Sequence, residues 1–351
     1  MRKVRIILGA AALTWIAAAL LVSCSRSEAR GKLQVFYSGN IRGSVSPCGC
    51  HTPKGGIARW AAFINRQKNP DASWLTVDAG DYVDRAGNSG CSGKCRFMVS
   101  SYEDLRYDVL NIGKQEVWLG YDALDSLIRS SAARNARFVS ANLVNVRTRR
   151  PVTDPTVIKE YGHFRIGVIG LLSESDFPRG SALLDSTHFA VTPYLEAAGR
   201  YLPSLIRKTD AVVVLGELGS GQIDTLVKAF PDIALVISTG AIRNGEQPMT
   251  IGKTRVLGTG SSGYNGHWAS IEFDPARRDS LGFSQYQDAL TDTYDEKGPW
   301  ADKLASFNAT SSPSLNPATT PASTASSPVS SSPTPTKNSL PVTTSSVPPK
   351  G

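Results

Sequence analysis

Short apolar stretches rich in β-branched residues recur along the middle of the chain, separated by polar loops and helical patterns. Stretches of this kind, bounded by Gly, Asp or Asn, are typical of strands buried in a sheet. We therefore predict strands at residues 33–37, 74–78, 109–112, 137–141, 157–161, 164–172, 211–215, 234–238, 254–258 and 268–273.

Helical spacing occurs between several of these strands. In Ile57–Ile64 and again in Leu124–Ile128, apolar residues recur as they do in a helix that packs one face against a sheet. Strands that alternate with helices predict an α/β domain built in layers. The segments 157–161 and 164–172 are separated only by Gly162-His163, which predicts a hairpin. Ligands of α/β sheets bind beyond the carboxyl ends of the strands, so the loops there are the candidate functional segments.

The N-terminus has the pattern of an export signal. Three basic residues, Arg2, Lys3 and Arg5, precede an uncharged apolar run from Ile6 to Val22. Segments of this kind are removed from the mature protein. The run is somewhat short for a membrane-spanning helix, which needs about 20 apolar residues. We therefore expect residues 1–23 to be a signal peptide and not part of the fold.

The apolar run ends in Leu21-Val22-Ser23-Cys24. Small residues directly before a cysteine resemble the lipobox of bacterial lipoproteins, and the resemblance implies that Cys24 becomes the lipid-carrying N-terminal residue. An ordinary export signal with a chance cysteine is the alternative. The next residue is Ser25 and not Asp, which by resemblance to Gram-negative sorting signals favours the outer membrane. We therefore predict a cell-envelope protein that is anchored to the outer membrane through Cys24 and faces the periplasm.

The C-terminal end differs in composition from the rest of the chain. From about Thr310 onward it is almost wholly Ser, Thr, Pro, Ala, Asn and Val, and Lys337 and Lys350 are its only charged residues. A segment with so few large apolar residues cannot bury enough surface to offset the entropy lost on ordering it. We predict a linker at residues 24–31, one folded domain at 32–307 and a disordered tail at 308–351.

The net charge of +8 is spread unevenly along the chain. The signal contributes three positive charges and the tail two, which leaves +3 for the residues between them. This value is ordinary for a soluble surface, and the domain has no basic run. We therefore expect no nucleic-acid partner. The lipid anchor makes the membrane the expected partner, and the sequence indicates no particular protein partner.

Short motifs lie at the ends of the predicted strands and at the start of the first helix. They are Gly55–Arg59, Val77–Asp81, Arg106–Gly113, Val139–Leu143, Ile166–Leu171, Val213–Leu215 and Gly258–Gly266. Their order and spacing resemble the metallophosphoesterase domain of the 5′-nucleotidase and UDP-sugar hydrolase family, the calcineurin-like phosphoesterases. The likeness extends from about Leu33 to Asp274. It implies a single α/β domain in the form of a four-layer α-β-β-α sandwich.

Members of that family bind two metal ions, which share a water molecule and activate it for attack on phosphorus. The ions need a set of His, Asp and Asn ligands at fixed positions. By resemblance, Asp81 keeps its identity as a ligand. Glu217 stands in place of a His and could still bind a metal.

The remaining ligand positions have changed. Asn40-Ile41-Arg42 stands where the family has Asp-x-His, and Lys114 and Gln115 stand in place of the Asn and the catalytic His of Gly-Asn-His-Glu. Arg42 and Lys114 put positive charge where the cations would bind, which disfavours the binding of a second metal ion. We therefore predict that the dinuclear site is largely lost, and we assign no catalytic residue. The last His pair of the family falls at Gly240 and Ile242, and none of His51, His163, His188 and His267 lies at a ligand position.

Four further cysteines, Cys48, Cys50, Cys91 and Cys95, lie in the loops after the first and second predicted strands. If the family topology holds, both loops leave the same sheet edge and the thiols converge beside the former metal site. Some exported relatives carry a Cys-Gly-Cys in this loop. Two structural disulfides are one expectation, with the pairing left open. A redox-active Cys-x-Cys pair is another, and zinc held by the cysteines, with His51 as a substitute ligand, is the third.

Three functions remain open at this point. The first is a lipid-anchored pseudoenzyme or binding scaffold, and it is the one that we favour. The second is a thiol redox or metal-binding function of the cysteine cluster, and the third is residual phosphoester hydrolysis. No counterpart of the family's nucleotide-specificity domain is visible, since the low-complexity tail begins where that domain would start.

Overall fold

The computed structural model describes residues 31–84, 90–132, 136–162, 164–178, 180–181, 184–240, 248–273, 281–294 and 298–311. These residues belong to one compact unit, Met1–Ser311, and residues 312–351 form a second unit. The predicted signal peptide, Cys24, residues 24–30 of the predicted linker, His163, Ile242 and the tail beyond Ser311 lie outside the described residues.

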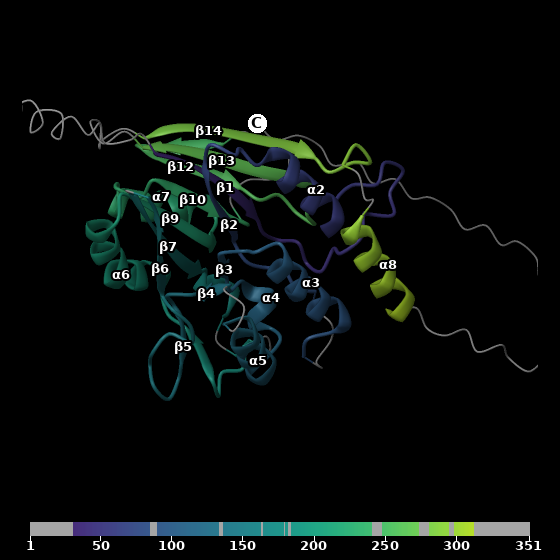
Figure 1. Cartoon of the computed structure of the whole chain (residues 1–351). Helices are drawn as coiled ribbons and strands as arrows, with labels where there is room; N and C mark the ends of the chain where they lie inside the picture. Colours follow the sequence, from purple (N-terminus) through teal and green to yellow (C-terminus); the bar gives the residue numbers. More distant parts are fainter. Residues whose placement is uncertain are drawn as a thin grey trace, which may run out of the picture. The chain divides into compact units, whose positions relative to one another are not determined.

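Two six-stranded sheets form the centre of the described unit (Figure 1). The strand order of the first sheet is β14 (Gly282–Ala289), β13 (Asn265–Phe273), β1 (Gly31–Ser38), β2 (Ser73–Asp78), β3 (Val109–Asn111) and β4 (Arg137–Val139). The order of the second is β11 (Met249–Ile251), β12 (Thr254–Gly258), β10 (Leu235–Ser238), β9 (Ala211–Glu217), β7 (Phe164–Leu172) and β6 (Thr156–Tyr161). Strands β1 to β4 are parallel, as are β7, β9, β10 and β12, whereas β6, β11, β13 and β14 pair antiparallel.

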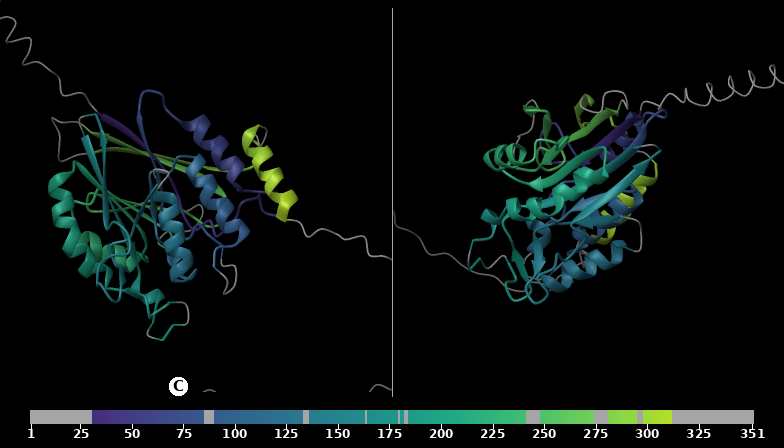
Figure 2. Two further views of the ribbon diagram at one scale, coloured as in Figure 1. Left: turned by 60° about the horizontal axis from the view of Figure 1, so that its bottom comes forward. Right: turned by 90° about the vertical axis from the view of Figure 1, so that its left-hand side faces the viewer.

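Helices cover the outer faces of both sheets (Figures 1 and 2). The first sheet is covered by α2 (Ile57–Gln67), α3 (Gly93–Asp104), α4 (Lys114–Val117) and α5 (Tyr121–Ala132), and the second by α6 (Tyr194–Lys208) and α7 (Ser220–Ala229). Helix α8 (Pro299–Ser311) packs on α3 by stacking Phe307 on Phe97, and the predicted domain end at residue 307 lies within it. The 3₁₀ turn η1 (Glu174–Asp176) and the paired short strands β5 (Leu143–Asn145) and β8 (Phe189–Val191) complete the described elements.

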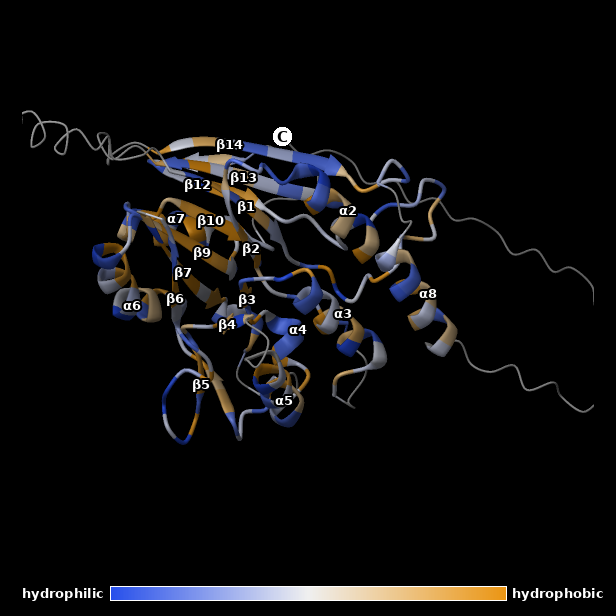
Figure 3. Cartoon of the chain, viewed as in Figure 1, coloured by the Kyte–Doolittle hydropathy of each residue, from blue (hydrophilic) through white to orange (hydrophobic). Residues whose placement is uncertain are grey.

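Three buried apolar clusters fill the three spaces between these four layers. Phe36 of β1 packs toward the helices that cover the first sheet, whereas its neighbour Val35 lies between the two sheets. Val213 of β9 also lies between the sheets, and Val214 packs toward α6 and α7. Such alternation is expected of strands that are covered on both faces, and Figure 3 shows the resulting hydrophobic strands in the second sheet. The four-layer α-β-β-α sandwich predicted from the sequence is confirmed.

The predicted strands are all present, and their ends differ by a few residues. The predicted hairpin is formed by β6 and β7, with Gly162 at a positive φ of 59° in the turn. Strand β14 was missed because it lies at a sheet edge and its residues are mostly exposed or half-buried, so they form no apolar run. In the part of the chain that the structure describes, no helix has the length and apolarity needed to cross a membrane.

One buried histidine makes the fold sensitive to acid. His267 of β13 is 3% exposed, stacks on Tyr37, and burial lowers its pKa to about 4. The unfolded chain binds this proton near pH 6.5, so the contribution of His267 to stability falls as the pH drops from 6.5 to 4, by up to about 3 kcal/mol.

We predict that His267→Phe, which keeps an aromatic ring at this position, removes most of this dependence. Urea unfolding at pH 7 and pH 4 measures it in both proteins. The loss of unfolding free energy should be about 2–3 kcal/mol smaller in the variant than in the unchanged protein. Equal losses would show that the histidine is not the acid-sensitive group.

Candidate functional site

The candidate site lies at the carboxyl ends of the parallel strands. Asp81 follows β2, Lys114 begins α4 after β3, and Glu217 is the last residue of β9. The N–H of Gln115 donates to Asp81 Oδ1 at 2.9 Å, and the N–H of Lys114 donates to Glu217 Oε2 at 3.2 Å. The sheets thus bring together four of the residues that the sequence singled out, from distant parts of the chain.

The ammonium of Lys114 supplies the positive charge inside this site. It forms an ion pair with Glu217 Oε1, and the exposed fractions of the two side chains are 21% and 8%. Burial lowers the pKa of Lys114, but the hydrogen bond and charge of Glu217, followed by the charges of Asp81 and Asp176, outweigh burial and raise it. Lys114 is therefore charged throughout the physiological pH range.

Carboxylates outnumber cations around this ammonium. Burial and then the charge of Asp81 raise the pKa of Glu217, against the effect of Lys114. Burial also raises the pKa of Asp176 in η1, again against Lys114. Both shifts arise because one cation faces several acidic groups in a partly dry site. Asp176 was missed by the sequence analysis, since it belongs to no motif.

Glu116 joins the loop after β2 to the loop after β3. Its carboxylate is fully buried and accepts the backbone N–H groups of Asp81, Tyr82, Val83 and Gly113 at 2.8–3.1 Å. Burial and the charge of Asp81 raise the pKa of Glu116 to about 8, although the N–H donors lower it. This role of Glu116 was not predicted from the sequence. The signal that could have revealed it is the Glu that this chain keeps in the Gly-Asn-His-Glu motif.

Three residues of the site have a left-handed backbone although none is glycine. The φ angle is 56° at Asn40, 51° at Arg42 and 62° at Asp81. This conformation is uncommon for residues with a side chain, and it tends to cluster at functional sites. The N–H groups of Asn40 and Arg42 donate to the carbonyls of Gly80 and Asp81 at 2.8 and 2.9 Å, so the loop after β1 is tied to the loop after β2.

The side chains of Asn40 and Arg42 bind each other beside the site. Arg42 Nε donates to Asn40 Oδ1 at 2.6 Å, and Asn40 Nδ2 donates to the carbonyl of Gly260 at 3.1 Å. Arg42 is exposed and pairs with no carboxylate among the described residues. Its charge is therefore screened by solvent, unlike that of Lys114.

A second buried carboxylate, Asp78, is held entirely by neutral donors. It accepts hydrogen bonds from Ser38 Oγ at 2.5 Å, from Tyr102 OH at 2.8 Å and from the N–H of Gly80 at 2.7 Å. Burial raises its pKa to about 6, against these donors. The network fixes the turn that presents Asp81.

The donors of the site do not fit a pair of metal ions. Both oxygens of Glu217 are bound to Lys114, and Asp81 Oδ1 is bound to Gln115. Of these carboxylate oxygens, Asp81 Oδ2 alone accepts no hydrogen bond from the described residues. Across the described ranges, no three His, Cys, Asp or Glu side chains are grouped so that they could hold a metal ion. Two ions would need several such donors.

The four cysteines pair within their own loops, Cys48 with Cys50 and Cys91 with Cys95. Cys50 is exposed, whereas Cys95 is fully buried at the start of α3. The N–H of Lys54 donates to Cys48 Sγ at 3.3 Å. The cysteines therefore form two local disulfides and not the four-thiol group that a zinc site would need, because a paired sulfur has no thiolate to offer a metal.

Known proteins share this fold. No family model matches the sequence. The sequence is 25% identical over 222 residues to the 2′,3′-cyclic-nucleotide 2′-phosphodiesterase/3′-nucleotidase of Salmonella typhimurium. The matched region covers 57% of this chain and 34% of that protein. The chain thus spans about a third of that relative's length.

Two solved structures are similar over 80% of the chain. The 5′-nucleotidase precursor from Thermus thermophilus has a TM-score of 0.64 and 20% identity, with 59% of it covered. The calcineurin-like phosphoesterase YfkN from Bacillus subtilis has a TM-score of 0.63 and 18% identity, with 98% of it covered. These similarities establish the fold.

We predict that Glu116→Gln destabilises the protein by about 3–5 kcal/mol, because an amide NH₂ would face N–H donors that are now paired with a buried carboxylate oxygen. Urea unfolding measures the change. Glu160→Gln on the exposed side of β6 is the matched control, and it should cost less than about 0.5 kcal/mol. Equal stability of the two variants would refute the joining role of Glu116.

Proposed function

The chain resembles the 5′-nucleotidase-like metallophosphoesterases in sequence and in fold, and on this premise we propose that it is a lipid-anchored envelope protein whose former catalytic site serves as a noncatalytic binding scaffold. The ion pair of Lys114 with Glu217 carries the proposal. An ammonium that occupies a carboxylate at a former ligand position competes directly with a metal cation for it.

The ordered loops around this ion pair support a site that still binds a ligand, and not one that has lost all function. Glu116 still joins two loops through four backbone N–H groups, and Asn40, Arg42 and Asp81 keep left-handed backbone conformations. Strained conformations persist only where the surrounding structure enforces them. Loss of the metal ligands therefore left the shape of the site in place.

The proposal of a membrane anchor comes from the sequence. The basic residues, the apolar run and the small residues before Cys24 together support export and lipid attachment. Placement in the outer membrane, facing the periplasm, is supported by Ser25.

We expect the purified full-length protein to carry no stoichiometric transition metal, because both oxygens of Glu217 are bound to Lys114 and Asp81 Oδ1 is bound to the N–H of Gln115. Phosphate release from p-nitrophenyl phosphate with added Mn²⁺ or Zn²⁺ should equal that of the Asp81→Ala variant. Metal analysis of the purified protein measures the metal content, and a phosphate assay measures the hydrolysis. Metal-dependent turnover that Asp81→Ala abolishes would instead establish residual hydrolysis.

A thiol function is the second candidate, and the exposure of the Cys48–Cys50 disulfide favours it. An external dithiol can reach Cys50, which is exposed. One thiolate of the dithiol attacks a sulfur of the protein disulfide and forms a mixed disulfide with it. The second thiol of the same dithiol then attacks this mixed disulfide and frees the protein thiol. The protein gains two thiols, the reductant becomes a disulfide, and two electrons and two protons are transferred.

We predict that a short pulse of dithiothreitol reduces Cys48–Cys50 before Cys91–Cys95, because attack requires access and Cys95 is fully buried. Alkylation followed by mass spectrometry of peptides measures the order, with the second disulfide as the internal control. Reduction of both disulfides at the same rate, or of Cys91–Cys95 first, would argue against a reactive Cys48–Cys50 pair.

A further inference from the structure

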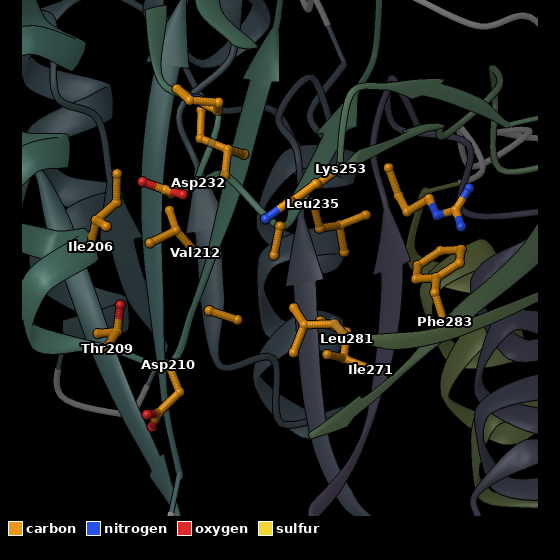
Figure 4. A pocket seen from close by; sticks show the side chains of 15 residues that line it. Ile206, Thr209, Asp210, Val212, Asp232, Leu235, Lys253, Ile271, Leu281 and Phe283 are labelled. Atoms are coloured by element: carbon orange, nitrogen blue, oxygen red, sulfur yellow. The ribbon is translucent and has the colours of Figure 1, made fainter. Parts of the chain in front are cut away.

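A pocket of about 350 Å³ lies at the end of the strands opposite to the candidate site (Figure 4). It is lined by residues at the starts of β9, β10 and β12, including Val212, Leu235 and Arg255, and by Ile271 near the end of β13. Along β9 the distance from Val212 to Glu217 is about 16 Å, at about 3.3 Å per residue. The pocket and the candidate site are therefore separate.

The described chain begins beside this pocket. Leu33 pairs with the pocket residue Ile271, and Gly31, the first described residue, pairs with Phe273. Cys24 precedes Gly31 by seven residues, which span at most about 24 Å when fully extended. A lipid on Cys24 would therefore hold the pocket end of the domain close to the membrane and the candidate site farther from it.

The lining of the pocket combines an apolar floor with unpaired charges of both signs. Lys253 and Asp232 form no ion pair with any residue that the structure describes, and in Figure 4 Lys253 extends over the pocket. Asp210 differs, since it accepts the N–H of Arg165 at 2.7 Å. The apolar residues include Ile206, Val212, Leu235, Ile271, Leu281 and Phe283.

Arg255 also lines the pocket, but its guanidinium already has partners. Its guanidinium lies 5.5 Å from the ring centre of Phe283 and donates to Thr250 Oγ1. Lys253 and Asp232, which form no ion pair among the described residues, lie with the apolar floor in one pocket, and this combination matches a ligand that carries one negative group, one positive group and a hydrocarbon chain.

We propose that this pocket binds a zwitterionic phospholipid with an ammonium headgroup, such as phosphatidylethanolamine, from the anchoring membrane. Its phosphate binds Lys253, its ammonium binds Asp232, and an acyl chain lies on the apolar floor. The membrane as the source of the ligand rests on the proposed lipid anchor, whereas the chemistry of the ligand rests on the pocket alone.

The test is a titration of the full-length protein with dihexanoyl phosphatidylethanolamine below its micelle concentration, followed by calorimetry. We expect saturable binding, and at least tenfold weaker binding for Lys253→Met and for Asp232→Asn. Lys94→Met and Asp122→Asn, which remove exposed charges outside the pocket, are the matched controls and should bind as the unchanged protein does. Dihexanoyl phosphatidylglycerol, which lacks the ammonium, should bind more weakly.

Absence of saturable binding, or binding that is insensitive to Lys253→Met and Asp232→Asn, would overturn the proposal. Binding of phosphorylethanolamine as tightly as of the lipid would also overturn it, because the apolar floor would then contribute nothing. Flotation of the full-length Lys253→Met variant with phosphatidylethanolamine vesicles tests the anchor separately, because its pocket is expected to bind the lipid weakly. Failure of this variant to float, while the unchanged protein binds the short-chain lipid, would refute the anchor and leave the pocket assignment standing.

Discussion

The buried carboxylate of Glu116 is the interaction on which the candidate site depends. Its oxygens accept N–H groups from residues 81–83 on one loop and from Gly113 on the next, so one side chain sets the spacing of both loops. Those loops carry Asp81 and Lys114, and Asp81 in turn receives the N–H of Gln115. A polar group buried this deeply is tolerated only because donors surround it. The geometry of the site is therefore held by backbone hydrogen bonds.

This arrangement accounts for each carboxylate in turn. Hydroxyl and N–H donors hold Asp78, backbone N–H groups hold Glu116, and Lys114 holds Glu217. Asp81 is the exception, because its Oδ2 accepts no hydrogen bond from the described residues. Buried carboxylates without donors or cations would be costly. Lys114 contributes its own cation to this site, which offsets part of the cost of grouping several carboxylates there.

The sequence predicted the elements whose signal is local, and it missed those that depend on distant partners. Strands such as β9 are apolar on both faces and therefore stand out as continuous runs, whereas β14 at the sheet edge does not. The motif comparison singled out Lys114 and Glu217, but their pairing joins residues 103 positions apart and needed the structure. Three of the four donors to Glu116 lie 33 to 35 positions away on another loop, and no spacing in the sequence reveals them. Likewise, the sequence showed two cysteine pairs but could not choose among the pairings.

That choice of pairing bears on what the cysteines do. In the chain-entropy treatment, a disulfide that closes a loop of three to five residues stabilises a protein by about 2 kcal/mol, whereas one from Cys48 to Cys91 would contribute about 4 kcal/mol. The observed pairs therefore forgo half of the stabilisation that the same cysteines could provide. The Cys91–Cys95 disulfide has a packing role, since Cys95 in the first turn of α3 is fully buried among the core residues. Cys48–Cys50 has no comparable packing, because Cys50 is exposed. Its role is to be sought in the shape of the loop or in reaction with a dithiol, and not in the stability of the fold.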